Sequence, residues 1–215
     1  MPFIEINTNF RPGFESLHIF ILMIFVVWLI ILIFSLKKYG VNKTIRYFVP
    51  IMIAGVIGEF CAMANSGYYY PGYFLYFSAI GASVPVIIAL GWSVNLFIFL
   101  HLGKGVASKF YKKQNLKQLF YISVCAGFFG VCLDLLEDPL AHHNGWWVWN
   151  TSIQRIYLFD VPLTNFVGWF VIIGGMTLLT LLIDRSRFSE NRKLLINLTA
   201  PLAFFILLAP YFLLR

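Results

Sequence analysis

Charged residues are scarce in this chain, and acidic residues are scarcer than basic ones. Only 12% of the 215 residues are charged, nine are Asp or Glu, and 60% are hydrophobic. A mean hydropathy of +0.81 excludes an ordinary soluble globular core. We therefore expect a membrane protein, in which each acidic side chain inside the bilayer is costly to place.

Residue types that commonly bind metals are also few. The three cysteines, Cys61, Cys125 and Cys132, lie in apolar stretches at spacings that match no zinc or redox motif, so we expect them to pack as small hydrophobic residues. The chain has only four histidines, fewer than a membrane di-iron oxidase or desaturase needs. The paired Asp-rich motif that binds magnesium and diphosphate in prenyltransferases is missing too. We predict no metal and no other cofactor.

Six apolar stretches are long enough to cross a membrane, since a spanning helix needs about 20 mostly apolar residues. They are residues 17–36, 47–65, 78–100, 117–136, 163–183 and 194–214. The sequence therefore predicts an all-α, polytopic integral membrane helix bundle of six or seven transmembrane helices. We expect residues 1–215 to form a single integral membrane domain, with residues 1–16 as a short N-terminal lead-in.

The distribution of basic residues predicts the orientation of the bundle. Lys and Arg gather in three loops, at 37–46, 104–117 and 185–193, whereas the alternate loops carry only Arg155. By the positive-inside rule, the three basic loops belong in the cytoplasm and both termini outside the cell membrane. The net charge of +7 then reflects topology and contacts to anionic lipids, and it does not indicate nucleic-acid binding.

Two aromatic loops are expected on the outer side. Residues 66–77 form an uncharged, Tyr-rich loop with a Pro-Gly turn, and residues 139–162 form the longest loop, which is rich in Trp. Tyr and Trp gather at membrane interfaces in any case, so most of these rings have an ordinary explanation. The functional alternative is that ring faces stabilise a carbocation, which we favour for the deeper Trp92 and Trp169.

Glu59 lies inside the second apolar stretch, where an acidic residue costs roughly 2.5 to 3.5 kcal/mol at the bilayer centre. Ala54, Gly58 and Ala62 beside it form a small-residue stripe that lets helices pack closely. An apolar helix junction favours the neutral form of a carboxyl group. We therefore predict that Glu59 is protonated at neutral pH and acts as an acid. The alternative is a structural hydrogen bond between helices.

A second acidic group closes the fourth apolar stretch. Asp134 and Asp138 are four residues apart and share a helix face, with Glu137 as their neighbour. Crowded carboxyl groups can divide their roles, one staying protonated while another is ionised, which suits acid and base catalysis at one site. The alternative is that Glu137 and Asp138 are solvated at a helix end. His142 and His143 follow closely and leave an iron or zinc site as the less favoured alternative.

The predicted topology brings these side chains to the outer half of the membrane. Glu59 lies past the midpoint of the second span, and Asp134 and Asp138 lie at the outer end of the fourth. Asn165 and Trp169 fall in the first turns of the fifth span. Acids, amide and aromatic rings can thus line one cavity that opens toward the outer leaflet. The Asn165 amide would orient a water or a carboxyl group there, or alternatively make a helix-start hydrogen bond.

Three patterns follow one another between residues 59 and 169, about half of the chain. The first is Glu59, then Gly67, the Tyr-rich segment to Tyr76, Val84-Pro85 and Gly91-Trp92. The second is Asp134-Leu-Leu-Glu-Asp138-Pro139-Leu-Ala141, then Gly145-Trp146-Trp147-Val-Trp149. The third is Tyr157, then Val161-Pro162-Leu-Thr-Asn165-Phe166-Val-Gly168-Trp169. In order and spacing they resemble the carotenoid biosynthesis membrane proteins that include bisanhydrobacterioruberin hydratase and the γ-carotene 1′-hydroxylase type. That family usually has Gly before the Val-Pro pair, where this chain has Asp160.

The resemblance implies a cofactor-free hydratase that adds water across the terminal C1=C2 bond of an acyclic isoprenoid end. Protonating that alkene gives a tertiary cation, which needs a protonated carboxyl group, aromatic faces and a controlled water. Glu59 and Asp138 are then the acid candidates, and Asp134 is a partner that tunes them or holds water. The residues expected to bind substrate are Trp92, Asn165, Trp169, Tyr76 and Trp149. The expected partners are a long acyclic polyene or isoprenoid and the membrane lipids.

Two alternatives stay open at this point. An integral-membrane terpene or carotenoid cyclase would use the same protonation but quench the cation with an internal double bond. A non-catalytic carotenoid or lipid carrier, or a small transporter that uses Glu59 as a proton site, would need no reaction at all. The additional acid Asp160 leaves the exact substrate open.

Overall fold

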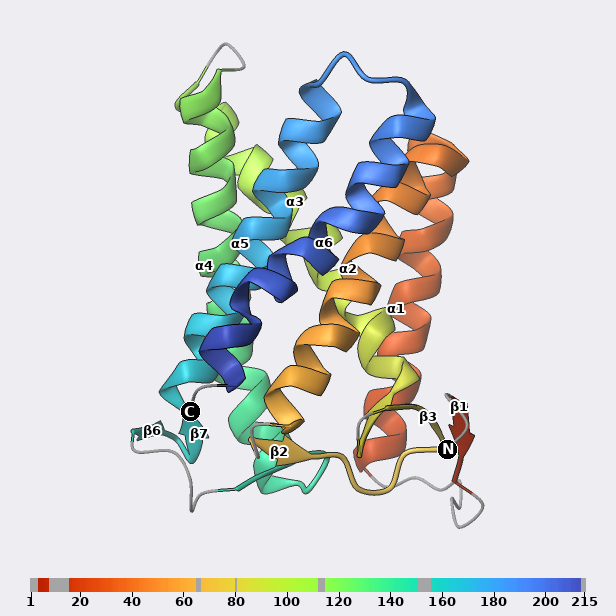
Figure 1. Cartoon of the computed structure of the whole chain (residues 1–215), viewed down its shortest axis with the longest axis vertical. Helices are drawn as coiled ribbons and strands as arrows, with labels where there is room; N and C mark the ends of the chain where they lie inside the picture. The colour runs from red at the N-terminus through yellow and green to blue at the C-terminus, as the bar shows by residue number, and fades with distance from the viewer. Residues whose placement is uncertain are drawn as a thin grey trace.

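The computed structural model describes residues 4–7, 16–64, 67–79, 81–111, 115–150 and 156–213. Within them, helices run up and down along the long axis of the molecule (Figure 1). The helices are α1 (Ser16–Tyr39), α2 (Val41–Ala64), α3 (Val86–Ser108), α4 (Leu116–His143), α5 (Leu163–Arg185) and α6 (Glu190–Leu213). The predicted all-α bundle class is confirmed.

Among the described residues, the five helices α1 to α5 are long and apolar enough to cross a membrane. The chain is therefore a multi-pass membrane protein by the length and composition of its helices. Helix α1 leaves most of its large apolar side chains exposed, as a lipid-facing helix does. Helix α6 packs against α2 and α5.

Local sequence signals explain several helix ends. Pro85 and Pro162 are extended residues directly before α3 and α5, where a residue without an N–H donor costs no hydrogen bond. The Asn115 side chain caps α4 by accepting a hydrogen bond from the Gln118 backbone N–H at 2.8 Å. Gly40, with φ +77°, lets the chain turn between α1 and α2 within one residue.

Small residues set the spacing of α3, α4 and α5. A Cβ at Gly103 would lie 2.7 Å from the backbone oxygen of Ile122, and one at Gly127 would lie 2.9 Å from that of Phe170. These distances are shorter than side chains tolerate, so the helices approach closely only because glycine is present. Such close packing is the usual basis of helix association in a bilayer.

Short strands gather at one end of the bundle, which we call the strand end (Figure 1). There β1 (Ile4–Ile6), β3 (Leu75–Ala79) and β4 (Ala82–Pro85) form an antiparallel sheet in the order β1-β3-β4. Strand β2 (Tyr68–Tyr69) pairs with β5 (Val148–Trp149), and β6 (Tyr157–Leu158) pairs with β7 (Val161–Pro162). The α1–α2, α3–α4 and α5–α6 connections lie at the opposite end, which we call the basic end. The β2–β5 pair joins the two aromatic loops.

Two predicted boundaries are wrong. The third span was expected to begin at 78, but residues 78–85 belong to a hairpin and α3 begins at Val86. The hairpin forms because Gly81, at φ +78°, makes its turn and because β1 pairs with its outer strand. The long loop was expected to begin at Pro139, yet α4 continues through it to His143. A proline removes one helical hydrogen bond, and neighbouring helices let a membrane helix tolerate that loss.

The turn between β6 and β7 explains the glycine expected there. Phe159 has φ 53° and Asp160 has φ 63°, both in the left-handed region that suits glycine. Asp160 tolerates this conformation better than most residues, and its side chain is exposed. The substitution therefore changes a turn at the surface.

Candidate active site

Glu59 is buried, with 7% of its surface exposed, and its carboxyl group accepts three hydrogen bonds. The donors are the Tyr68 hydroxyl, the Tyr70 hydroxyl at 2.7 Å and the indole Nε1 of Trp92 at 3.0 Å. Tyr68 and Tyr70 come from the loop that follows α2, which folds back over the end of its own helix. Trp92 comes from α3. Three neutral donors thus fix the position of the carboxyl group without a charged partner.

Asp134 and Asp138 form a second buried centre with Asn165. Their exposed fractions are 0% and 3%. The Asn165 amide donates to both oxygens of Asp134, at 3.1 and 2.9 Å, and to Oδ2 of Asp138 at 2.5 Å. The two carboxyl groups also lie within hydrogen-bonding reach of each other. A hydrogen bond between two carboxyl groups requires a proton on one of them.

Tyr70 connects the two acidic centres. Burial raises the pKa of Tyr70 well above its usual range, and the nearby carboxyl groups of Glu59 and Asp138 raise it further. The phenol therefore keeps its proton and remains a hydrogen-bond donor. Because Tyr70 interacts with acids from both α2 and α4, the two centres belong to one site.

Trp92 and Trp169 form an aromatic wall next to Glu59. Their rings stack with centroids 4.6 Å apart and an interplanar angle of 28°. Gly55 on α2 makes room for this pair, because a Cβ built there would overlap the Trp92 ring. The Trp92 indole thus presents its N–H edge to Glu59 and its face to Trp169.

The tryptophan-rich segment after α4 covers the tyrosines. Trp149 packs on Tyr68 with ring centroids 4.4 Å apart, and Trp147 contacts Tyr70 at 5.9 Å. The ring of Trp146 stacks on Phe20 of α1 at 4.5 Å. The aromatic residues of both loops and of α1 therefore enclose the acids from the strand end.

A cavity of about 710 Å³ opens at the strand end and reaches this enclosure. Its lining residues are Ile4, Glu5, Ile6, Asn7, Tyr70, Tyr76 and Ser83. The Tyr76 hydroxyl accepts from the Tyr73 backbone N–H at 2.8 Å and donates to the Tyr70 carbonyl at 3.2 Å. These bonds hold the loop that carries Tyr70, the one residue named here that contacts both the cavity and Glu59.

The structure brings most of the predicted site residues together. Glu59 meets Trp92, Asp134 and Asp138 meet Asn165, and Trp169 joins through Trp92. Trp149 reaches Glu59 only through Tyr68, and Tyr76 lines the cavity.

The sequence predicted no specific role for Tyr68 and Tyr70, although the hydroxyl groups of both donate hydrogen bonds to Glu59. They follow Glu59 by only nine and eleven residues, and that short separation was the available signal.

Three further residues considered from the sequence, Glu137, His142 and Asp160, lie at the edge of the site or outside it. Glu137 is half-buried on α4. His142 Nδ1 accepts the Trp149 backbone N–H at 3.3 Å, which fits a supporting role. Asp160 lies exposed in the β6–β7 turn. Among the described residues, no group of three or more His, Cys, Asp or Glu side chains is arranged to hold a metal ion.

The described residues therefore define a multi-pass helical membrane protein with buried carboxyl groups beside stacked aromatic rings. The chain belongs to the carotenoid biosynthesis protein family, whose model matches residues 18–214. The predicted family resemblance is confirmed, and with it a role in carotenoid biosynthesis and a carotenoid or isoprenoid substrate. No curated protein and no solved structure matches the chain.

Proposed function

We propose that the protein is a cofactor-independent carotenoid hydratase, which adds water to the terminal C1=C2 double bond of an acyclic carotenoid end. The observation that carries this proposal is the pairing of two buried carboxyl centres beside the stacked Trp92 and Trp169 rings. Acids at this depth are costly, so their retention indicates chemistry that requires them.

The Asp134–Asp138 pair is the proton source in this mechanism. The proton that the two carboxyl groups share is transferred to the C2 carbon of the alkene. A C–H bond forms, the π bond breaks, and the pair is left with one more negative charge. Asn165, which donates to both residues, stabilises the new carboxylate and holds the two groups in place.

The tertiary cation then forms at C1 beside the aromatic wall. Ring faces stabilise a desolvated cation by about 2 kcal/mol, and the Trp92–Trp169 pair offers such faces. The Glu59 carboxylate adds an opposite charge. Its donors hold it beside the aromatic wall, so we assign ionised Glu59 to charge stabilisation and base catalysis, and protonated Glu59 stays an acid candidate beside Asp138.

Water completes the reaction. Tyr70 stands between Glu59 and the strand-end cavity, which provides a route for water. The water oxygen bonds to C1, and the proton it releases passes to a carboxylate, so that the acid is regenerated after transfer within the site. The net change is the addition of one water molecule, with no oxidant or reductant.

A carotenoid cyclase is the second candidate, because the same acids would start a cyclisation. The cavity beside Tyr70 favours hydration, since a cyclase must keep water away from the cation. A carrier without catalytic activity would gain nothing from two acidic centres that are costly to bury.

The decisive experiment is incubation of the membrane-embedded protein with an acyclic carotenoid in ¹⁸O-water, followed by mass spectrometry. We expect a tertiary alcohol that carries the label. An unlabelled isomer with a new ring would establish cyclisation instead, and unchanged polyene across several acyclic substrates would establish a binding protein.

A further inference from the structure

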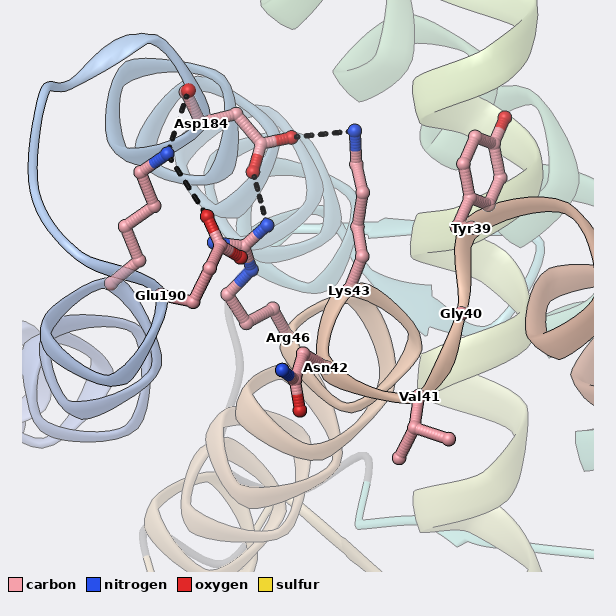
Figure 2. Close-up of a pocket in the computed structure, with 9 residues that line it drawn as sticks. Tyr39, Gly40, Val41, Asn42, Lys43, Arg46, Asp184 and Glu190 are labelled. Carbon is pink, nitrogen blue, oxygen red and sulfur yellow. Dashed lines mark hydrogen bonds and ion pairs between the residues drawn. The ribbon is translucent and has the colours of Figure 1, made fainter.

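A second cavity, polar and of about 460 Å³, lies at the basic end of the bundle. Figure 2 shows the residues that line it. The cavity is formed where α1 passes into α2 and where α5 passes into α6. Its lining residues are Tyr39, Gly40, Val41, Asn42, Lys43, Arg46, Asp184, Glu190 and Lys193. None of these residues takes part in the proposed hydration.

Ion pairs on one side of this cavity engage both of its carboxylates. Arg46, only 4% exposed, pairs with Asp184 at 3.3 Å and with Glu190 at 2.9 Å. Lys43 approaches Asp184 at 3.7 Å, and Lys193 approaches Glu190 at 3.3 Å (Figure 2). Each carboxylate is therefore shared between Arg46 and a lysine.

Further ammonium groups lie over the rings of Tyr39, which lines the cavity, and of Tyr47. Lys38 lies 5.4 Å from the Tyr39 ring centroid, and Lys104 lies 5.8 Å from that of Tyr47. Lys43 lies over both rings, at 5.3 and 5.6 Å. Around this cavity the described residues thus place five cationic side chains against two carboxylates. Such an excess of like charge is unfavourable without a counter-anion.

The first turn of α2 adds to this positive environment. Gly40, Val41 and Asn42 line the cavity where α2 begins, and the free N–H groups of a helix start attract anions. The buried Nε of Arg46 has no hydrogen-bond partner among the described residues. An N–H donor, a helix start and excess ammonium groups together match the acceptor oxygens and charge of a phosphate group.

We propose that this cavity binds a phosphate ester at the basic end of the bundle. Val41, which lines the cavity, is 61% exposed, and Leu36 and Phe34 in the last two turns of α1 are exposed as well, so this end of α1 and α2 offers apolar side chains for acyl chains. The same phosphate chemistry is present in the headgroup of an anionic phospholipid and in a soluble phosphate compound. This site is independent of the hydration chemistry at the strand end.

The test compares binding of two probes to the purified full-length protein. Phosphatidylglycerol retained in native mass spectra, relative to phosphatidylcholine, reports a lipid headgroup. Line broadening in ³¹P NMR spectra of inorganic phosphate and pyrophosphate reports a soluble ligand. We expect preferential retention of phosphatidylglycerol, and a Lys43→Gln variant should lower it about fivefold, because the Lys43 ammonium group lines the cavity and can contact the bound phosphate directly.

Two matched variants make the outcome decisive. Lys43→Arg keeps the charge and should keep the binding, whereas Lys37→Gln removes an exposed charge from the same end and should leave it unchanged. Binding of the inorganic anions alone would identify a soluble phosphate compound as the occupant. Binding of neither probe, or equal losses in Lys43→Gln and Lys37→Gln, would overturn the proposal and leave only a general surface charge.

Discussion

Single side chains at the acidic site are positioned by neutral donors. Phenols and an indole surround Glu59, and an amide bridges Asp134 and Asp138. A strongly paired cation would fix the charge of a carboxyl group, because a buried pair is broken only at a high cost. Neutral donors hold the geometry while leaving a proton free to move, which general acid–base catalysis requires.

Asp138 is the residue whose change tests the proposed proton source most directly. An Asp138→Asn variant keeps the shape of the side chain but removes the transferable proton, so the hydration rate should fall at least ~10²-fold. Folding should be little affected, since an amide is cheaper to bury than a charge. Rates are measured by product analysis in membranes, with protein amount and melting temperature as the check on folding.

Asp160→Asn is the matched control for this change, because it makes the same substitution at an exposed turn. It should turn over normally, and asparagine also tolerates the left-handed backbone there. The hydration rate of a Glu59→Gln variant should fall by a factor similar to that of Asp138→Asn. Near-normal rates in both site variants would remove the carboxyl groups from the mechanism.

The acids themselves could be predicted from the sequence, whereas their partners could not. A carboxyl group in an apolar stretch stands out because placing it in the membrane costs free energy, so Glu59 and Asp138 could be chosen as candidates from the sequence. A tyrosine near the membrane surface is common, so nothing in its type marked Tyr70 as a Glu59 partner. That contact depends on how the loop folds back over α2, which is a tertiary property.

At the scale of helices and strands, the close approach of α2 to α3 sets the position of the aromatic wall, Trp92 and Trp169. Gly55 leaves the space that Trp92 fills, and Trp92 in turn bonds Glu59 and stacks on Trp169. One missing side chain on α2 thus positions groups from α3 and α5. Because the interior of a protein is closely packed, a change in side-chain volume on one helix shifts the side chains that pack against it.

A Gly55→Ala variant should therefore lose activity although every carboxyl group of the site is kept. The added methyl group would displace the Trp92 ring from Glu59, and small misplacements at a reacting centre are costly, so we expect at least a ~10-fold fall in rate. Gly175→Ala on α5 is the control, because a Cβ there meets no described atom within 4 Å. Melting temperature and product formation are measured in parallel.

A second substitution separates the two possible effects of Gly55→Ala. Trp92→Phe alone removes the N–H that Glu59 accepts without adding an overlap at Gly55, so activity should fall while the melting temperature stays near that of the parent protein. Full activity in Gly55→Ala alone would show that the wall is not needed in this position.

The elements differ in how far their sequences predict them. Hydropathy located α1, α2, α5 and α6 because long apolar runs in this chain are helices. It failed over residues 78–85, since a short apolar run reads alike as strand or helix. The pairing of β1 with β3 is a contact between distant segments, and no local pattern encodes it.

For the whole molecule, the main feature is polarity along the bundle axis. The candidate acids Glu59, Asp134 and Asp138 belong to the halves of α2 and α4 nearer the strand end, whereas Lys43, Arg46 and Lys193 line the cavity at the basic end. Figure 1 shows these two ends on opposite sides of the bundle. The positive-inside rule predicts that the basic end faces the cytoplasm. The site would then serve the outer leaflet.

Cysteine labelling of intact cells checks this orientation. In a background without Cys61, Cys125 and Cys132, single cysteines are placed at the exposed positions Phe110 and Phe188 of the basic end and at Leu158 of the strand end. An impermeant thiol reagent should label only Leu158→Cys from outside, and the other two only after the cells are opened. Labelling of Phe110→Cys or Phe188→Cys in intact cells would invert the orientation.

The placement of the acids at a single end has a consequence for a substrate with two identical ends. A polyene long enough to cross the bilayer presents one terminus to the site while its other terminus lies in the opposite leaflet. If the proposed hydration takes place at this end, one terminus reacts in each encounter, and the molecule must leave, reverse its orientation in the bilayer and bind again before the second reacts. The proposal therefore predicts a mono-alcohol that is released into the membrane, where other enzymes can compete for it, and a yield of diol that depends on how fast the carotenoid reverses its orientation.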